Sequence, residues 1–270
     1  MSWSNILAPL LGGEPDGQIL DTAAALAAPF NATVTAAYAS SSPASLYAWA
    51  NDSGIGVTDL AIAEFQRLST AGEARARELL AALDYPYKAF QNVTSADWLD
   101  LRVASRLADV VVWPMATARG HGFFAGAFQQ ILMDERRPVL IADRPVPVGG
   151  VAVVAWDGGR EASRAARRAV PWLNKAEHVV VLTAPLTTAC GSDDGRLIDY
   201  LADQGIHAEA VSLRARGEAG PLLLDKAREL GATVLVAGAF GHPRLQRFIF
   251  GGTTQILLDG ASDAALFLSH

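Results

Sequence analysis

Two short stretches in the second half of the chain have residue types suited to binding a phosphorylated ligand. The first begins Gly238-Ala-Phe-Gly241 and, after nine further residues, continues as Gly251-Gly-Thr-Thr254. Its spaced glycines allow a tight turn and a close approach of the backbone to a ligand. The second part opens an expected short helix, whose N-terminus offers free backbone N–H groups, a partial positive charge and two threonine hydroxyls. The alternative is a glycine turn with a threonine N-cap and no ligand.

The second stretch, Ala155-Trp-Asp157-Gly-Gly159, ends the strand expected at the start of this half. In a parallel sheet whose order reverses here, the first and fourth strands are neighbours. Asp157 and Gly238 then face one crevice outside the carboxyl ends of the strands, where open α/β sheets bind ligands. A carboxylate in that place can accept hydrogen bonds from ribose hydroxyls. The alternative role of Asp157 is to cap the helix that begins near Gly159, and the two roles are compatible.

Several catalytic and metal-binding patterns are missing from the sequence. It contains neither G-x-x-x-x-G-K-[ST] nor G-x-G-x-x-G, which argues against P-loop and Rossmann enzymes. The single cysteine, Cys190, excludes an intrachain disulfide and a cysteine-rich metal site. The five histidines show no metal-ligand spacing, although His242 falls in the glycine-rich loop. No catalytic residue and no metal site are therefore predicted.

Composition and charge narrow the class of protein further. The chain has 270 residues, of which 51% are hydrophobic and 19% charged, enough to bury a core in each of two domains. Its net charge of −6 does not favour nucleic acid or an anionic membrane as a partner. No apolar run reaches the length of a membrane span, and Met1 to Asn5 do not resemble the start of a signal peptide. The expected location is the cytoplasm.

The same series of strands and helices is expected twice along the chain. Strands are predicted at 6–10, 33–39, 87–93, 108–113 and 138–142, and again at 151–155, 178–183, 207–213, 232–237 and 264–269. Helices are expected between them, among them 16–28, 58–83, 161–173 and 194–204. This alternation predicts an α/β protein of two tandem, doubly wound parallel domains, at 1–146 and 150–270. The linker is placed at 143–150, where prolines and glycines break the periodicity.

The first helix of the second copy has two chemically different sides. Its alanines at 162, 165, 166 and 169 share one face, which is expected to be buried. The arginines at 160, 164, 167 and 168 lie largely elsewhere. They are predicted to form a solvated outer face.

The glycine-rich loop and the strands before it resemble the ATP-binding signature of universal stress proteins. The resemblance is carried by Gly238-x-x-Gly241, the later Gly251, the strand at 231–238, and Ala155-Trp-Asp-Gly-Gly159. It covers both halves, so the chain resembles a tandem universal stress protein. This implies five parallel strands per domain in the order 3-2-1-4-5, an adenine nucleotide alpha hydrolase-like fold. It also implies an adenine nucleotide across the ends of strands one and four.

The resemblance also assigns site residues to the second copy. Those expected to border adenine and ribose are Ala155, Trp156, Asp157 and Ala184. Those expected to follow ribose and the phosphates are Ala237, Gly238, Phe240, Gly241 and Arg244. Those expected to cradle the phosphates are Gly251, Gly252, Thr253 and Thr254. Gly252 is a departure, because serine often follows the glycine in the family pattern, and one hydroxyl is lost.

The first copy lacks the corresponding residue types. Leu11 stands where the second copy has Asp157, Pro114 replaces Gly238, and Phe128 takes the place of a threonine. Leucine cannot hydrogen-bond a ribose, and proline lacks an N–H. The first copy is therefore predicted to be a degenerate domain with a structural or partner-binding role. The apolar residues near its crevice are interpreted as core packing in preference to a ligand site; they are Trp113, Met115, Phe123, Phe124 and Phe128.

The function that the resemblance implies is a regulator that holds ATP, with or without Mg²⁺, in its C-terminal domain. Little or slow hydrolysis is expected, because no P-loop lysine or obvious base is present. Two alternatives stay open. One is an ATPase or nucleotidyl-transferring enzyme that uses Arg244 and Arg247, and the other is a nucleotide-free protein-interaction module. The two halves are expected to pack as an intramolecular pseudo-dimer, and the association of two chains into a homodimer is left open.

Overall fold

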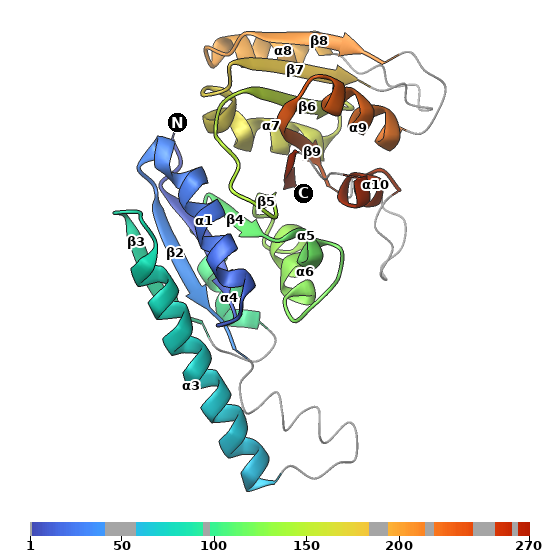
Figure 1. Ribbon diagram of the computed structural model, residues 1–270. Coiled ribbons are helices and arrows are strands. Elements are labelled where there is room, and N and C mark those ends of the chain that lie inside the picture. The colour runs from blue at the N-terminus through green and yellow to red at the C-terminus, as the bar shows by residue number, and fades with distance from the viewer. Residues whose placement is uncertain are drawn as a thin grey trace.

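The computed structural model describes residues 2–40, 58–93, 98–183, 194–213, 219–239, 252–260 and 264–270. The chain folds into two α/β halves, drawn from blue to green and from yellow to red in Figure 1. Within the described ranges, no helix is both long and apolar enough to cross a membrane.

The N-terminal half has five parallel strands with helices on both faces. The strands are β1 (Asn5–Leu10), β2 (Thr33–Tyr38), β3 (Lys88–Asn92), β4 (Val110–Trp113) and β5 (Val139–Ile141). The helices are α1 (Pro15–Ala27), η1 (Ala28–Phe30), α3 (Asp59–Ala82), α4 (Leu99–Ser105), α5 (Met115–Ala118) and α6 (Ala125–Met133). The strand order is β3-β2-β1-β4-β5. The short helix α5 directly follows β4, where the sequence predicted a loop.

The C-terminal half repeats this plan. Its strands are β6 (Val151–Trp156), β7 (His178–Thr183), β8 (Ala208–Ser212), β9 (Ala232–Gly238) and β10 (Ala265–Ser269). Its helices are α7 (Arg160–Leu173), α8 (Asp194–Asp203), α9 (Ala219–Glu229) and α10 (Gly252–Gly260). The strand order is β8-β7-β6-β9-β10, so both halves have the predicted order 3-2-1-4-5. The prediction of two tandem, doubly wound five-stranded units is confirmed.

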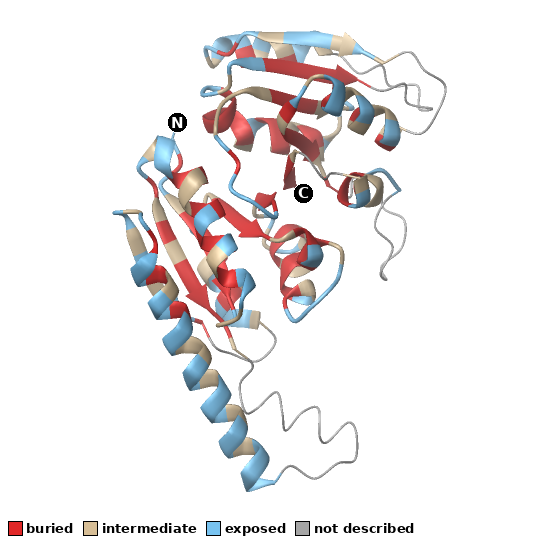
Figure 2. Cartoon of the chain, in the orientation of Figure 1, coloured by how far each residue is buried: buried red, intermediate tan, exposed pale blue. Residues whose placement is uncertain are grey.

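The sequence pattern explains which strands lie at the centre. The inner strands are almost continuous apolar runs, and Ile6 to Leu10 of β1 are all buried, as in sheets covered on both faces. The outer strands β3 and β8 contain only partly buried and exposed residues. The four alanines of α7 predicted to face the core are buried. Figure 2 shows the contrast between the buried strands and α3, whose first half extends beyond the sheet and is largely exposed.

The two halves join along one pair of strands. β5 and β10 pair antiparallel, with Leu140 opposite Phe267, and this pairing makes a single ten-stranded sheet. On one face Trp3 of the first half stacks on Phe267, with ring centroids 5.9 Å apart, and meets Trp172 edge-on at 6.3 Å. The two halves therefore pack directly against each other within one chain.

A polar clasp crosses the junction on the other face. Arg119 of the first half donates from Nε and Nη2 to the carbonyl of Leu258, at 3.0 and 2.8 Å, and from Nη2 to that of Asp259 at 3.2 Å. Both carbonyls belong to the last turn of α10, where helical carbonyl groups lack partners and the helix dipole favours a cation. Arg119 thus caps a helix of the other half.

The loop between β1 and α1 is held by a buried carboxylate. Asp16 accepts hydrogen bonds from the backbone N–H of Leu11, at 3.1 Å, and of Gly12, at 2.6 Å. Burial raises the pKa of Asp16 above its ordinary value, and the hydrogen bonds from the loop only partly oppose that rise. The hydrogen bonds of Asp16 hold the loop in place. Burial, however, makes the charged form of this carboxyl less favourable than it is in water.

The clasp predicts that Arg119→Ala will destabilise the protein. The variant leaves the carbonyls of Leu258 and Asp259 without their charged donor, so the free energy of unfolding should fall by about 1–2 kcal/mol in urea denaturation. Arg75→Ala is the control, because Arg75 is an exposed residue of α3 whose ion pair with Glu78 is long, at 3.7 Å, and solvent-exposed. Equal losses in both variants would show that the clasp adds no stability.

The raised pKa of Asp16 predicts the sign of a pH dependence. Because the folded state favours the protonated carboxyl, stability from Asp16 is greatest below the unfolded pKa of about 4 and falls as pH rises through the folded pKa. The difference in unfolding free energy between wild type and Asp16→Asn should therefore decrease between pH 3.5 and 7. Glu135→Gln should show the opposite slope, because Arg106 and Arg102 lower the pKa of Glu135. A rising Asp16 difference would contradict this assignment.

Candidate functional site

The carboxyl ends of three strands lie side by side in the C-terminal half. β6 pairs with β9 through Val154 and Val236, and with β7 through Trp156 and Thr183. Continuing this register places Ala155 beside Ala237 and Trp156 beside Gly238. The structure thus brings these four predicted site residues together at one edge of the sheet.

Gly238 has a packing role at this edge. A Cβ on Gly238 would lie 2.4 Å from the backbone nitrogen of Ala162 and 2.6 Å from the carbonyl carbon of Glu161. The end of β9 therefore touches the first turn of α7 with no room for a side chain. The sequence assigned the close backbone approach at Gly238 to a ligand, whereas the observed neighbour is the α7 backbone. This contact fixes the N-terminus of α7 against the carboxyl edge.

The capping role that the sequence left open for Asp157 is not observed, because the N-cap residue of α7 is Gly159 and the helix has no side-chain cap; Asp157 instead holds the loop before the helix. Its Oδ1 accepts a hydrogen bond of 2.7 Å from the N–H of Gly159, the N-cap residue of α7. Asp157 itself is exposed. Its carboxylate is thus held at the carboxyl edge while remaining accessible from solvent, an arrangement compatible with a second hydrogen bond to a hydroxyl group.

The N-terminus of α10 is accessible on one side only. Gly252 and Thr253 are exposed, and a Cβ on Gly252 would meet no heavy atom within 4 Å. Thr254 is buried, so its hydroxyl is not presented to solvent as the sequence expected. Further along the helix, Ile256 packs against Gly220 of α9. Of the two threonines, Thr253 is the one available to a ligand.

Part of the predicted site lies outside the described residues. This applies to five predicted site residues, Ala184, Phe240, Gly241, Arg244 and Gly251. It also applies to Cys190, His242 and Arg247. Among the residues that are described, no group of three or more His, Cys, Asp or Glu side chains is placed to hold a metal ion.

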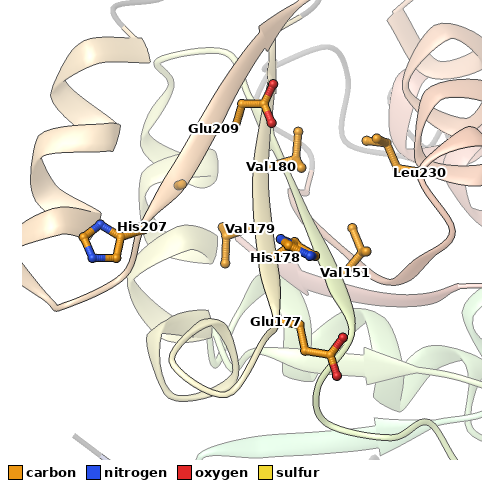
Figure 3. A pocket seen from close by; sticks show the side chains of 9 residues that line it. Val151, Glu177, His178, Val179, Val180, His207, Glu209 and Leu230 are labelled. Carbon is orange, nitrogen blue, oxygen red and sulfur yellow. The ribbon is translucent and has the colours of Figure 1, made fainter.

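A hollow of about 560 Å³ lies at the other edge of the C-terminal half (Figure 3). Val151, His178 and Ala208, near the amino ends of β6, β7 and β8, line it together with Glu177, His207, Glu209 and others. Ligands of open α/β sheets bind outside the carboxyl ends of the strands. Position in the fold therefore favours the carboxyl edge over this hollow as the candidate site.

The corresponding edge of the N-terminal half is occupied by α3. A Cβ on Gly12 would lie 2.3 Å from the Cα of Gly72, so loop and helix backbones are in direct contact. Gly12 has φ of +79°, a conformation that favours glycine. The hydroxyl of Tyr38, at the end of β2, donates to the carbonyl of Ser69 at 2.7 Å. Helix α3 therefore packs over the carboxyl ends of β1 and β2.

Internal carboxylates satisfy the backbone donors at this edge. Asp16 accepts from Leu11 and Gly12 after β1, and Oδ1 of Asp143 accepts from the N–H of Met115 after β4, at 2.8 Å. These are positions where a bound anion would otherwise find N–H groups. Each of these N–H groups therefore already has an acceptor within the protein.

Aromatic packing fills the remaining space beside β4. Phe124 and Phe128 meet Trp113 edge-on, with ring centroids 5.5 and 6.0 Å apart. These three residues and Met115 are buried, so the core-packing interpretation describes them. Phe123 differs, because it is 41% exposed and packs on Trp98 at 4.2 Å.

Sequence reasoning missed the groups that close the N-terminal edge. Gly72, within the expected long helix, was an available signal, because an isolated glycine in a helix often marks close backbone packing. Asp16 lies only four residues from Gly12 and was interpreted merely as the start of a helix. Asp143 lies 28 residues from Met115, and no local pattern indicates their hydrogen bond.

Comparison with known proteins supports the fold. The sequence matches no model of a known family and no curated protein. A universal stress protein from Archaeoglobus fulgidus DSM 4304 is similar over 99% of this chain and 96% of its own, with a TM-score of 0.69 and 18% identity. A functionally unknown protein from Pseudomonas aeruginosa PAO1 is similar over 98% and 92%, with a TM-score of 0.58 and 16% identity. The chain therefore shares the fold of a universal stress protein along nearly its whole length.

Proposed function

We propose that this chain is a universal stress protein-like regulator that binds an adenine nucleotide, ATP, at the carboxyl edge of its C-terminal half. The observation that carries the proposal is the difference between the two carboxyl edges. In the first half, Gly72 contacts the β1 loop, and Asp16 and Asp143 satisfy its backbone donors. In the second half, Asp157 and the start of α10 are exposed.

The chemistry of the second edge suits a nucleotide. The carboxylate of Asp157 is an acceptor for ribose hydroxyls, and its bond to Gly159 holds it in place. The backbone N–H groups of the first turn of α10 and the hydroxyl of the exposed Thr253 suit phosphate oxygens, which the helix dipole also attracts. The small side chain of Ala155 leaves space beside the base.

The proposed role is binding with little or slow turnover. Phosphoryl transfer needs groups that position the attacking water and neutralise the developing charge. The sequence supplies neither a P-loop lysine nor an obvious base, and Mg²⁺, if bound, would be held chiefly by the phosphates. The enzyme alternative depends on Arg244, so multiple-turnover ATP hydrolysis that is abolished by Arg244→Ala would favour it.

The ribose contact predicts that Asp157→Asn will weaken ATP binding. Asparagine keeps an oxygen for the N–H of Gly159 but loses the charge, so calorimetry should show a Kd about 5–30 times higher than in wild type. The matched control is Asp16→Asn, the carboxylate of the equivalent loop in the first half, which should leave ATP affinity unchanged.

The result can also exclude the proposal. If wild-type protein binds no ATP below millimolar concentration, the proposed nucleotide site is excluded and the nucleotide-free interaction module is favoured. An equal loss in Asp16→Asn and Asp157→Asn would place the site elsewhere or show a general loss of folding, which circular dichroism of both variants would distinguish.

Two glycines at this edge should respond in opposite ways to alanine. Gly238→Ala forces a Cβ into the backbone of α7 and should lower the free energy of unfolding by about 1–3 kcal/mol. Gly252→Ala has open space and should change stability by less than about 1 kcal/mol, yet weaken ATP binding because the Cβ crowds the phosphates. Urea denaturation and calorimetry measure the two effects. A stable Gly238→Ala, or a Gly252→Ala with unchanged ATP affinity, would contradict these roles.

A further inference from the structure

Helix α10, whose first turn is the proposed phosphate-binding element, packs closely against α9 along one side. A Cβ on Gly220 of α9 would lie 2.7 Å from Cγ2 of Ile256, and a Cβ on Gly260 of α10 would lie 2.4 Å from Cδ1 of Leu224. At both contacts a glycine on one helix admits a branched side chain of the other. These contacts fix the distance between the helices, but two contacts along one line do not by themselves fix how α10 tilts about that line.

The last turn of α10 has a second hold, from the first half of the chain. Arg119, directly after α5, donates to the carbonyl of Leu258 at 3.0 and 2.8 Å and to that of Asp259 at 3.2 Å. Its side chain is only 35% exposed, so these bonds are partly shielded from water. A planar guanidinium that donates from two nitrogen atoms to successive carbonyl groups fixes orientation as well as distance.

The equivalent helix of the first half, α6, ends in a cap made by the residues that follow it. The N–H groups of Asp134 and Glu135 donate to the carbonyl of Gln130, at 2.9 and 3.0 Å. The N–H of Arg137 donates to the carbonyl of Ile131 at 3.0 Å. The last carbonyl groups of α10 instead obtain a donor from a residue 139 positions away in the sequence. The two copies therefore differ in how this helix is held.

Two physical effects connect Arg119 with the far end of α10. A cation near the C-terminus of a helix offsets the negative end of its dipole. However, α10 has nine residues and is therefore about 13 Å long, whereas the Debye length at physiological ionic strength is about 8 Å. The charge of Arg119 thus acts only weakly at the first turn. Tilt is the stronger effect, because a hydrogen-bonded helix moves as one body and small misplacements of binding groups are costly.

We propose that Arg119 is a positioning residue for phosphate binding, because its hold on the last turn of α10 sets the tilt that presents the first turn and Thr253 to the ligand. This inference rests on the proposed function and gives the first half a part in it. The proposed ribose contact of Asp157 lies after β6 and not on α10, so it does not depend on this hold. Arg119 therefore affects binding of the phosphates of ATP and not binding of its nucleoside part.

Calorimetry with ATP and, at higher ligand concentration, with adenosine tests this division. Arg119→Gln removes the charge and the paired donors, and should raise the Kd for ATP about 3–20 times while leaving the Kd for adenosine unchanged. Asp157→Asn should weaken binding of both ligands, because both contain the ribose. The ratio of the two Kd values is a readout that a merely structural role of Arg119 would not move.

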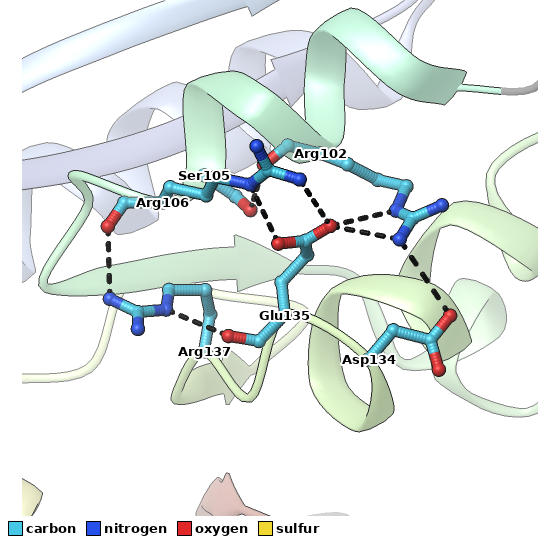
Figure 4. A network of polar contacts seen from close by, with 6 residues as sticks. All are labelled: Arg102, Ser105, Arg106, Asp134, Glu135 and Arg137. Carbon is cyan, nitrogen blue, oxygen red and sulfur yellow. Dashed lines mark hydrogen bonds and ion pairs between the residues drawn. The ribbon is translucent and has the colours of Figure 1, made fainter.

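The matched control is Arg106→Gln, which removes the same charge within the first half. Arg106 donates from Nε to the carboxylate of Glu135 at 2.8 Å, in a network with Arg102 and Arg137 (Figure 4). Like Arg119, it connects segments that are distant in the sequence, but this partner belongs to its own half. The control variant should bind ATP and adenosine as wild type does.

Several outcomes would overturn the proposal. They are unchanged ATP affinity in Arg119→Gln, equal losses for ATP and adenosine, and an equal loss of ATP affinity in Arg106→Gln. If wild type binds no ATP, the proposed function fails and this inference fails with it, whereas the other outcomes leave the nucleotide site intact. If Arg119→Gln does not fold, Arg119→Lys replaces it, because lysine keeps the charge without the paired donors. The same selective loss for ATP is then expected, and wild-type ATP affinity would overturn the proposal.

Discussion

The antiparallel pairing of β5 with β10 is the contact on which the rest of the structure depends. A five-stranded parallel half ends in a buried strand with unpaired N–H and C=O groups, which in isolation invites association with other chains. Pairing the two removes both of these edges and lets the apolar layers on each face continue from one half to the other. The outer edges that remain, β3 and β8, are the strands with least buried surface.

This pairing also directs the carboxyl edges of the two halves in opposite directions, so each crevice is built from its own half. Both edges use a glycine for direct contact between backbones, Gly12 with Gly72 and Gly238 with Ala162. The consequence differs. The first contact lays a long helix over the strand ends, whereas the second only seats the start of α7. The copies thus differ in what packs on the strand ends, while the order of the strands is the same in both.

Arginines at the junction between the halves have different surroundings on its two faces. On one side Arg119 finds helix carbonyls and stabilises the contact between halves. On the other, Arg168 of α7 is partly buried, and this burial lowers the pKa of its guanidinium. The same residue type therefore closes the interface in one place and leaves it electrostatically unfavourable in another.

By itself, the sequence determined the strands and most helices, because buried parallel strands are continuous apolar runs that end at glycines. Through its resemblance to a known family it also indicated the strand order, and hence that Ala155, Trp156, Ala237 and Gly238 lie together. It also indicated which copy lost the polar groups of a binding site. Only the tertiary structure decided that α7 occupies the space beside Gly238 and that Thr254 is buried. It also decided that Asp143 and Arg119 hydrogen-bond to residues far away in the sequence. The physical reason is distance along the chain: periodicity reports which face of an element is buried, but not which distant backbone, carboxylate or guanidinium lies against it.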